Sequence, residues 1–440
     1  MGGGVIQLAS IGAEDECLIA HPQITFFKIV FRRHTPFCME SIPQKIKGKI
    51  AFGRKVTCII AKNGDLIQSC VLEVEMDKPT VASSTWANWL GHKLIKYVDF
   101  EIGGQRIDRQ TGEWMHIWNE LSCPTGKRIG YNQMIGSDPS QIIQNDKIRL
   151  YIPLHFWFCQ FSGAALPIVS LKHHSIKIHI HFNSLEHCLM NELTGAPITT
   201  TSTQSIKAKL FIDYIFIGEK ERLKLTKQTQ EFLITQVQYS GQHVLVPDLE
   251  QEIQLHFNHP VKELIWVCKK KQSIPTIDRL PGEWDSILEE WHVPLTGYVQ
   301  HPFETYPNII NTNSNGEIVE SPVYEKTIYV IQPMAFENFE ISNECQLIFN
   351  GSERFQIRSG DFFTKIQPFQ HHTNIPTNPI HVYSFCLNAD EYQPTGTCNM
   401  SEIEDVTLSI LTPGEELRIF AVSYNILRIK NGICGLAFGD

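Results

Sequence analysis

Two histidines with a following glutamate form the pattern in this sequence that is best suited to metal chemistry. His179, His181 and Glu186 have the His-x-His and Glu spacing with which cupin enzymes hold a transition metal on barrel strands. However, isoleucines occupy positions 176, 178 and 180, and we expect them to face the core. Because side chains alternate along a strand, both histidines should then face outward. The cupin glycines are also missing, with His173 and Leu193 in their places. No metal site is therefore expected.

Other catalytic signatures are absent from the sequence. It contains no Gly-x-Ser-x-Gly elbow, phosphate-binding loop or Gly-x-Gly-x-x-Gly motif. The adjacent acids Glu289 and Glu290 are typical of a solvated loop. The sequence therefore predicts no enzymatic activity and no cofactor. Two sequons make Asn350 and Asn399 candidate glycosylation sites, although Asn350 also has a structural use in an Asn-Gly turn.

Length and composition indicate a folded protein of two domains. The 440 residues suffice for two cores of roughly 200 residues each, and 42% of them are hydrophobic. The net charge of −9 repels nucleic acid, and Arg32 and Arg33 lie in a basic stretch too short and too apolar for a DNA-binding arm. The 12 scattered cysteines predict reduced, buried thiols. No signal peptide or membrane span is predicted, so we expect a soluble, unsecreted chain.

The elements that must position these residues are mainly β-strands. Apolar side chains alternate with polar ones, for example from Ile206 to Phe216 and from Cys345 to Phe349, as in half-buried antiparallel strands. Asn-Gly dipeptides at Asn63, Asn315, Asn350 and Asn431 favour tight hairpin turns. Helical periodicity is sparse, and its best example runs from Trp114 to Leu121, which predicts a helix that plugs a barrel end or is inserted in a loop. The pattern predicts an all-β sandwich or barrel.

The chain also shows signs of an internal duplication. The segment from 219 to 235 is charged and does not alternate, so we interpret it as a linker. On either side of it, residues 100–107 are similar to residues 348–355, each with a strand, a glycine turn and then arginine with an apolar residue. We therefore expect an N-terminal segment at 1–30, a first domain at 31–218 and a second domain at 236–440.

Several longer motifs resemble one protein family along the whole chain. They include Pro22-Gln23-Ile24-Thr25-Phe26-Phe27-Lys28, Arg32-Arg33-His34-Thr35, Glu101-Ile102-Gly103-Gly104-Gln105-Arg106-Ile107-Asp108, Phe257-Asn258-His259-Pro260 and Gln393-Pro394-Thr395-Gly396-Thr397-Cys398-Asn399-Met400-Ser401. In this order they resemble the major capsid proteins of nucleocytoplasmic large DNA viruses. The region from Lys270 to Val330 departs from the family pattern, and we interpret it as a variable outer loop.

The resemblance implies a structural protein of the virion capsid. Its fold would be two tandem eight-stranded antiparallel jelly-roll barrels with short helices in loops, and it would form homotrimers that tile an icosahedral shell. Its implied partners are neighbouring capsomers, minor capsid or cement proteins and an inner viral membrane, and the host cytoplasm would be the place of assembly. In such proteins the N-terminal segment lies on the inner side, which makes Phe26, Phe27, Arg32 and Arg33 candidate anchoring residues.

Two other classes of protein remain as alternatives. A β-sandwich that binds a carbohydrate or a cell-surface receptor would share the all-β pattern. A cupin metalloenzyme would share the jelly roll and the histidine pair. Solution mass separates the capsid protein from the first alternative, and metal analysis separates it from the second.

Overall fold

The computed structural model describes most of the chain and divides it into two units, Met1–Phe37 and Cys38–Asp440. The described residues are 3–12, 15, 19–29, 31–143, 146–191, 198–200, 202, 204–270, 298–300, 310–312, 318–320, 329–331 and 339–439. The first unit contains helix α1 (Gly3–Ala9). The outer loop predicted at 270–330 lies outside the described residues, apart from the short antiparallel pairs β15 (Tyr298–Gln300) with β18 (Tyr329–Ile331) and β16 (Ile310–Thr312) with β17 (Ile318–Glu320).

The first half of the larger unit folds into two antiparallel sheets. One sheet has the strand order β1 (Phe37–Gln44), β11 (Ile206–Ile217), β4 (Leu66–Asp77) and β8 (Lys147–Pro153). The other has the order β2 (Ile46–Lys47), β3 (Lys55–Ile59), β9 (Ile176–Phe182), β6 (Ile95–Ile102) and β7 (Gln105–Thr111). A short pair, β5 (Ser84–Trp86) with β10 (Leu189–Asn191), lies outside these sheets. The expected alternation of buried and half-exposed side chains is confirmed in most of β11 and in β9, but it was wrong for β20 (Glu344–Phe349), which buries Cys345, Gln346 and Leu347 in succession.

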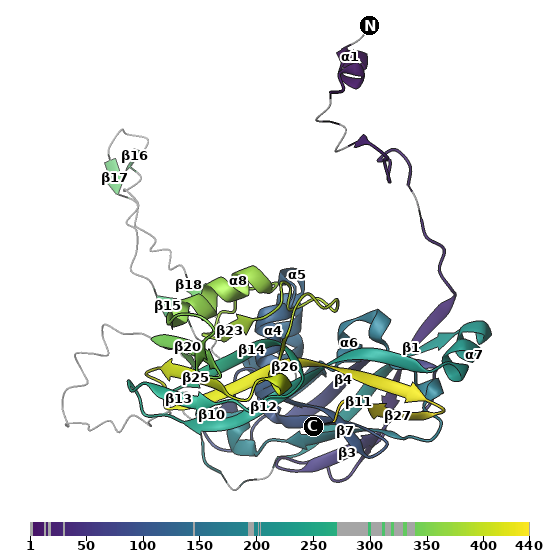
Figure 1. Ribbon diagram of the computed structural model, residues 1–440. Helices are drawn as coiled ribbons and strands as arrows, with labels where there is room; N and C mark the ends of the chain where they lie inside the picture. The colour runs from purple at the N-terminus through teal and green to yellow at the C-terminus, as the bar shows by residue number, and fades with distance from the viewer. Residues whose placement is uncertain are drawn as a thin grey trace, which may run out of the picture. The chain divides into compact units, whose positions relative to one another are not determined.

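The second half repeats this arrangement. One sheet has the order β12 (Gln230–Val244), β26 (Glu416–Lys430), β14 (Pro260–Lys269) and β19 (Phe339–Glu340), with β23 (His381–Ser384) and β24 (Cys398–Asn399) paired to β14 and β27 (Ile433–Leu436) paired to β26. The other has the order β13 (Gln251–Gln254), β25 (Val406–Leu411), β20 (Glu344–Phe349) and β21 (Ser352–Glu353), with β22 (Arg358–Ser359) paired to β20. Figure 1 shows β26, in yellow, between β12 and β14.

Both halves have the topology of a jelly roll. The eight main strands of the first half are, in chain order, β1, β3, β4, β6, β7, β8, β9 and β11. Numbered 1 to 8, they follow the orders 1-8-3-6 and 2-7-4-5 in the two sheets. The second half gives the same two orders when β23 is taken as its sixth strand. The fold is therefore all-β with two tandem jelly rolls, as the sequence predicted. The expected barrels are not closed, because in each half the strands form two separate sheets, and each roll is better described as a sandwich.

Each roll has its own apolar core, and a third core joins them. The third core contains Trp114, Ile117 and Trp118 from helix α4 (Gly112–Ser122), which packs against Ile265 of β14 and Phe420 of β26. The hydroxyl of Thr111 caps this helix by accepting a hydrogen bond from the Trp114 N–H at 3.1 Å. The helix is inserted between β7 and β8, so the predicted loop insertion is confirmed, and its apolar face holds the two rolls together.

The remaining helices are short and lie in connections. They are α3 (Leu90–Leu94), α5 (Thr125–Ile135), α6 (Trp157–Gln160), α7 (Glu219–Lys227) and α8 (Gln367–His371), which continues a π-helical turn at Phe362–Ile366. The region expected as a linker, 219–235, contains α7 and the start of β12. The hairpin turns predicted at Asn350 and Asn431 are confirmed, with φ angles of 48° and 52°. The hairpin predicted at Asn63 was wrong, because Asn63 lies between β3 and β4, which belong to different sheets, and its φ is not positive. The turn predicted at Asn315 lies outside the described residues.

We expect Gly112→Ala to destabilise the protein by about 1–3 kcal/mol, the range typical of overpacking. Gly112 begins α4 where that helix meets α3, and a Cβ atom there would overlap the carbonyl oxygens of His92 and Ile95. The matched control is Gly126→Ala in α5, where a Cβ atom would meet nothing within 4 Å. Denaturant unfolding should place the control at or above wild-type stability, because alanine favours a helix over glycine. Equal midpoints for the two variants would contradict the close approach of α3 and α4.

Candidate functional site

The histidine pair of β9 lies on the outer face of its sheet and is already occupied by protein partners. His179 is 2.8 Å from the Thr57 hydroxyl and 2.9 Å from a carboxylate oxygen of Glu101, whose other oxygen accepts a 2.6 Å bond from Lys177. The bonds from Lys177 and His179 lower the pKa of Glu101. The ring of His181 packs edge-on against Tyr97 at 4.9 Å. The predicted outward orientation is confirmed, and the pair belongs to a surface ladder across three strands.

Glu186 does not join the two histidines. Its carboxylate accepts a hydrogen bond from the Thr200 N–H at 3.2 Å. Among the described residues, no group of three or more His, Cys, Asp or Glu side chains could hold a metal ion. The cavity that Leu255, Trp266 and Leu408 line in the core of the second roll measures about 10 Å³, about the minimum for one water molecule.

The two sequon asparagines lie on the surface of the second roll and stabilise turns. The Asn350 side chain accepts a hydrogen bond from the Asp405 N–H at 2.9 Å. Asn399 accepts one from the Ser401 N–H at 3.2 Å and so caps the short 3-10 turn that follows. Both asparagines are exposed, and in both these bonds use the side-chain oxygen rather than the nitrogen that a glycan would take.

The candidate anchoring residues all belong to the N-terminal unit. Phe26 and Phe27 are 88% and 98% exposed, and Arg32 and Arg33 are exposed as well. The exposed aromatic and basic side chains thus share one stretch of about eight residues. None of the helices in the described part of the chain is both long and apolar enough to cross a membrane.

A buried ion-pair network that the sequence did not reveal connects the two rolls. Glu113 of α4 lies 2.5 Å from the ammonium of Lys269 on β14 and 2.8 Å from the guanidinium of Arg418 on β26. Glu113 and Lys269 are each 8% exposed. Burial by itself would lower the pKa of Arg418, but the charge and hydrogen bond of Glu113 raise it. One carboxylate of the first roll therefore joins two strands of the second.

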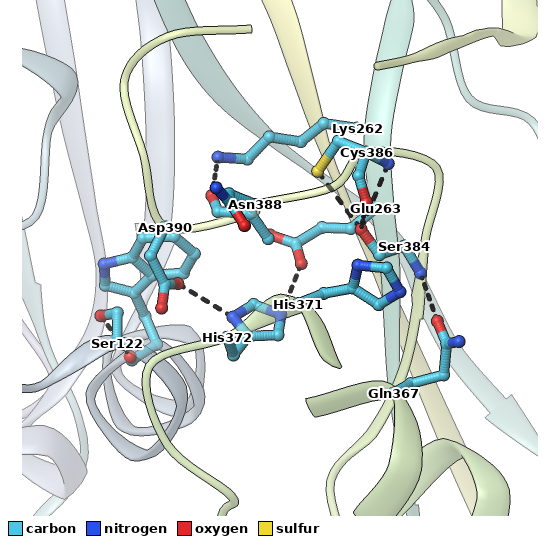
Figure 2. Close-up of polar contacts among 12 residues, drawn as sticks. Ser122, Lys262, Glu263, Gln367, His371, His372, Ser384, Cys386, Asn388 and Asp390 are labelled. Atoms are coloured by element: carbon cyan, nitrogen blue, oxygen red, sulfur yellow. Dashed lines mark hydrogen bonds and ion pairs between the residues drawn. The ribbon is translucent and has the colours of Figure 1, made fainter. Parts of the chain in front are cut away.

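A second buried network, which we call the histidine clamp, consists of Glu263, His372 and Asp390 (Figure 2). His372 follows α8 and lies between the carboxylates of Glu263 on β14, at 2.8 Å, and Asp390, at 2.9 Å. Burial alone would lower its pKa, but the charge of Glu263 and hydrogen bonds to both acids raise it to about 9. Burial would raise the pKa of Asp390, yet the bond from His372 lowers it. The imidazolium is therefore the stable form at neutral pH.

Lys262 extends this network toward the first roll. Its ammonium donates a hydrogen bond to the Ala389 carbonyl and lies 5.6 Å from the ring centre of Trp118 on α4. The Ala389 N–H in turn donates to the His371 carbonyl at 2.9 Å. The chain after β23 is thus bonded to β14 and to the end of α8, and Lys262 of β14 contacts α4. Buried charges that are paired in this way hold elements in fixed relative positions.

The sequence signal for both networks was weak. The paired residues of each network come from separate segments of the sequence, and Glu113 and Arg418 are 305 positions apart. The signal that could have found Glu113 is its place in the first turn of a predicted amphipathic helix, on the side that the tryptophans mark as buried. The histidine clamp had no such signal. The helix before His372 is short, and the residues that follow it favour turns, so no periodicity marks a buried side.

The chain is similar to viral capsid proteins over its full length. The family described as "Major capsid protein N-terminus" matches residues 25–218, and the one described as "Large eukaryotic DNA virus major capsid protein" matches residues 221–435. The major capsid protein of Pyramimonas orientalis virus is 36% identical over 471 positions, and that of Phaeocystis pouchetii virus is 34% identical over 524, each alignment covering 100% of both chains.

A solved structure agrees with these relatives. The capsid chain in a quasi-atomic model of the PBCV-1 virus capsid is 27% identical, with a TM-score of 0.71 over 94% of this chain and 100% of that chain. The similarity therefore extends through both rolls and the core between them, the same architecture that α4 and the two ion networks stabilise. The chain belongs to the major capsid proteins of large eukaryotic DNA viruses.

Proposed function

We propose that this major capsid protein trimerises into a pseudo-hexagonal capsomer, many copies of which tile the icosahedral shell of the virion. The observation that supports this most is the presence of two jelly rolls of the same topology in one chain. Three such chains supply six similar wedges, which close a hexagon when the first and second rolls alternate around a threefold axis. Such a ring requires a rigid joint between the two rolls. The apolar third core and the buried ion pair of Glu113 with Lys269 support a joint of this kind.

The proposal extends to partners along the chain. The N-terminal segment, residues 1–30, with Phe26, Phe27, Arg32 and Arg33 in or just after it, would lie on the inner side of the shell, toward minor capsid proteins and an inner viral membrane. Residues 31–218 and 236–440 would form the two rolls and 219–235 the linker. Assembly would take place in the host cytoplasm. The net charge of −9 disfavours direct binding to the genome. We propose no enzymatic activity, and we propose glycosylation at Asn350 or Asn399.

Solution mass tests the capsomer. We expect the purified full chain to sediment as a trimer of the 50.3 kDa protomer that persists on dilution, because permanent interfaces of this kind bury more than roughly 2,000 Å². A chain that stays monomeric at every concentration would contradict the proposal. Intact-mass measurement of the same sample would detect glycans at Asn350 or Asn399.

A further inference from the structure

Four exposed lysines and arginines lie along one edge of the first roll. Lys45, Lys47, Lys49 and Arg54 are exposed along β2 and the turn that leads into β3, and we call these four residues the basic edge. β2 is the outermost strand of its sheet. Between Glu40 and Asp65 the sequence has six lysines or arginines and no acid. In the part of the chain that the structure describes, these four side chains form no ion pair.

The matching edge of the second roll is acidic. Asp248, Glu250, Glu252, Glu402 and Glu404 are exposed on β13, on the turn before it and on the segment that leads into β25, and we call them the acidic edge. The two segments are held together where Leu255 N–H donates to the Val406 carbonyl at 2.8 Å. Neither residues 228–261 nor residues 387–417 contain a lysine or arginine.

The two edges occupy equivalent positions in the two rolls. β3 and β13 are each the second main strand of their roll, and each begins the sheet order 2-7-4-5. The basic edge adds β2 to the outer side of β3, whereas β13 itself is the outermost strand of its sheet. The equivalent edges of the two rolls therefore carry opposite charge. The described ion pairs include none that joins the two edges within a chain.

We propose that the basic edge of one copy docks against the acidic edge of a second copy, in a neighbouring capsomer. This inference rests on the capsomer proposed above. Within one capsomer, neighbouring rolls are related by rotation about the capsomer axis. The equivalent edges of all six rolls therefore point in the same direction around the ring, so an edge of one roll cannot face the equivalent edge of the next. A twofold relation between rings brings equivalent edges face to face. Opposite charge then favours contact of a first roll with a second roll and disfavours contact between two like rolls.

The test uses two charge-reversed full-length chains. The basic-edge variant carries Lys45→Glu, Lys47→Glu and Lys49→Glu, and the acidic-edge variant carries Glu252→Lys, Glu402→Lys and Glu404→Lys. We expect each variant to form trimers normally but to lose about tenfold or more in association between trimers, measured by sedimentation and light scattering at about 50 mM NaCl. Mixed in equal amounts, the two variants should recover association, since each then meets an edge of opposite charge.

The control carries the same charge change outside the edge, with Lys220→Glu, Lys227→Glu and Lys430→Glu at three exposed lysines, and should associate as wild type does. Raising NaCl to about 500 mM should weaken association of wild type and of the mixture alike. Thermal unfolding checks that each variant is folded, and glutamine at the three edge lysines offers a milder version. Wild-type trimers that never associate, or a mixture no better than its components, would overturn the docking. Failure to form trimers at all would instead overturn the capsomer.

Discussion

Replacing Glu113 with alanine is expected to lower the free energy of unfolding by about 3–5 kcal/mol, the cost typical of removing one partner of a buried ion pair. The carboxylate lies 2.5 Å from Lys269 and 2.8 Å from Arg418 at the junction of the two rolls. Without it, the ammonium of Lys269, which is 8% exposed, loses its closest anion. Denaturant unfolding of the full chain measures the change.

The matched control is Glu231→Ala. Glu231 pairs with Arg428 at the same distance of 2.8 Å, but both side chains are about half exposed, at 51% and 53%. Such surface pairs contribute about 0–1 kcal/mol, so the control should stay close to wild type. Replacing Glu113, Lys269 and Arg418 together by methionine should recover part of the loss, because apolar packing can replace a buried network. A Glu113→Ala variant as stable as the Glu231→Ala control would contradict the role of Glu113.

The strands and the duplication could be predicted from the sequence because their signals are local. In β9 the isoleucines 176, 178 and 180 are buried, and the side chains between them are half exposed, as the alternation requires. The helix from Trp114 to Leu121 was likewise predicted from its spacing. Local patterns state which side of an element is buried. They do not state what covers it, so the packing of α4 against the second roll came only from the structure.

The charged networks could not be predicted because they depend on contacts between distant segments. Glu263 and Asp390 come from separate parts of the second roll, and only its folding places His372 between them. The two charged edges are an intermediate case. Lysines 45, 47 and 49 alternate with uncharged residues in the sequence, but their match to the acids around β13 depends on sheet order, which composition does not reveal.

Raising the pH from about 6 to about 10 is expected to remove roughly 3 kcal/mol of stability that the histidine clamp supplies. The pKa of His372 is about 9 in the folded chain, above the ordinary histidine value of 6.5. A raised pKa means that the folded state binds the proton more tightly, so the contribution is complete below pH 6.5 and is lost as the pH rises through about 9. Deprotonation leaves the Glu263 carboxylate buried against a neutral ring.

The measurement is the difference in unfolding free energy between wild type and His372→Ala across this pH range. It should shrink with rising pH, because the variant has already lost the imidazolium, whereas other groups that titrate near pH 10 are common to both chains and cancel. The control is His256→Ala, at an exposed histidine, whose difference from wild type should stay flat. A constant difference for His372→Ala would mean that the histidine packs as a neutral ring and that no charged clamp holds α8 to β14.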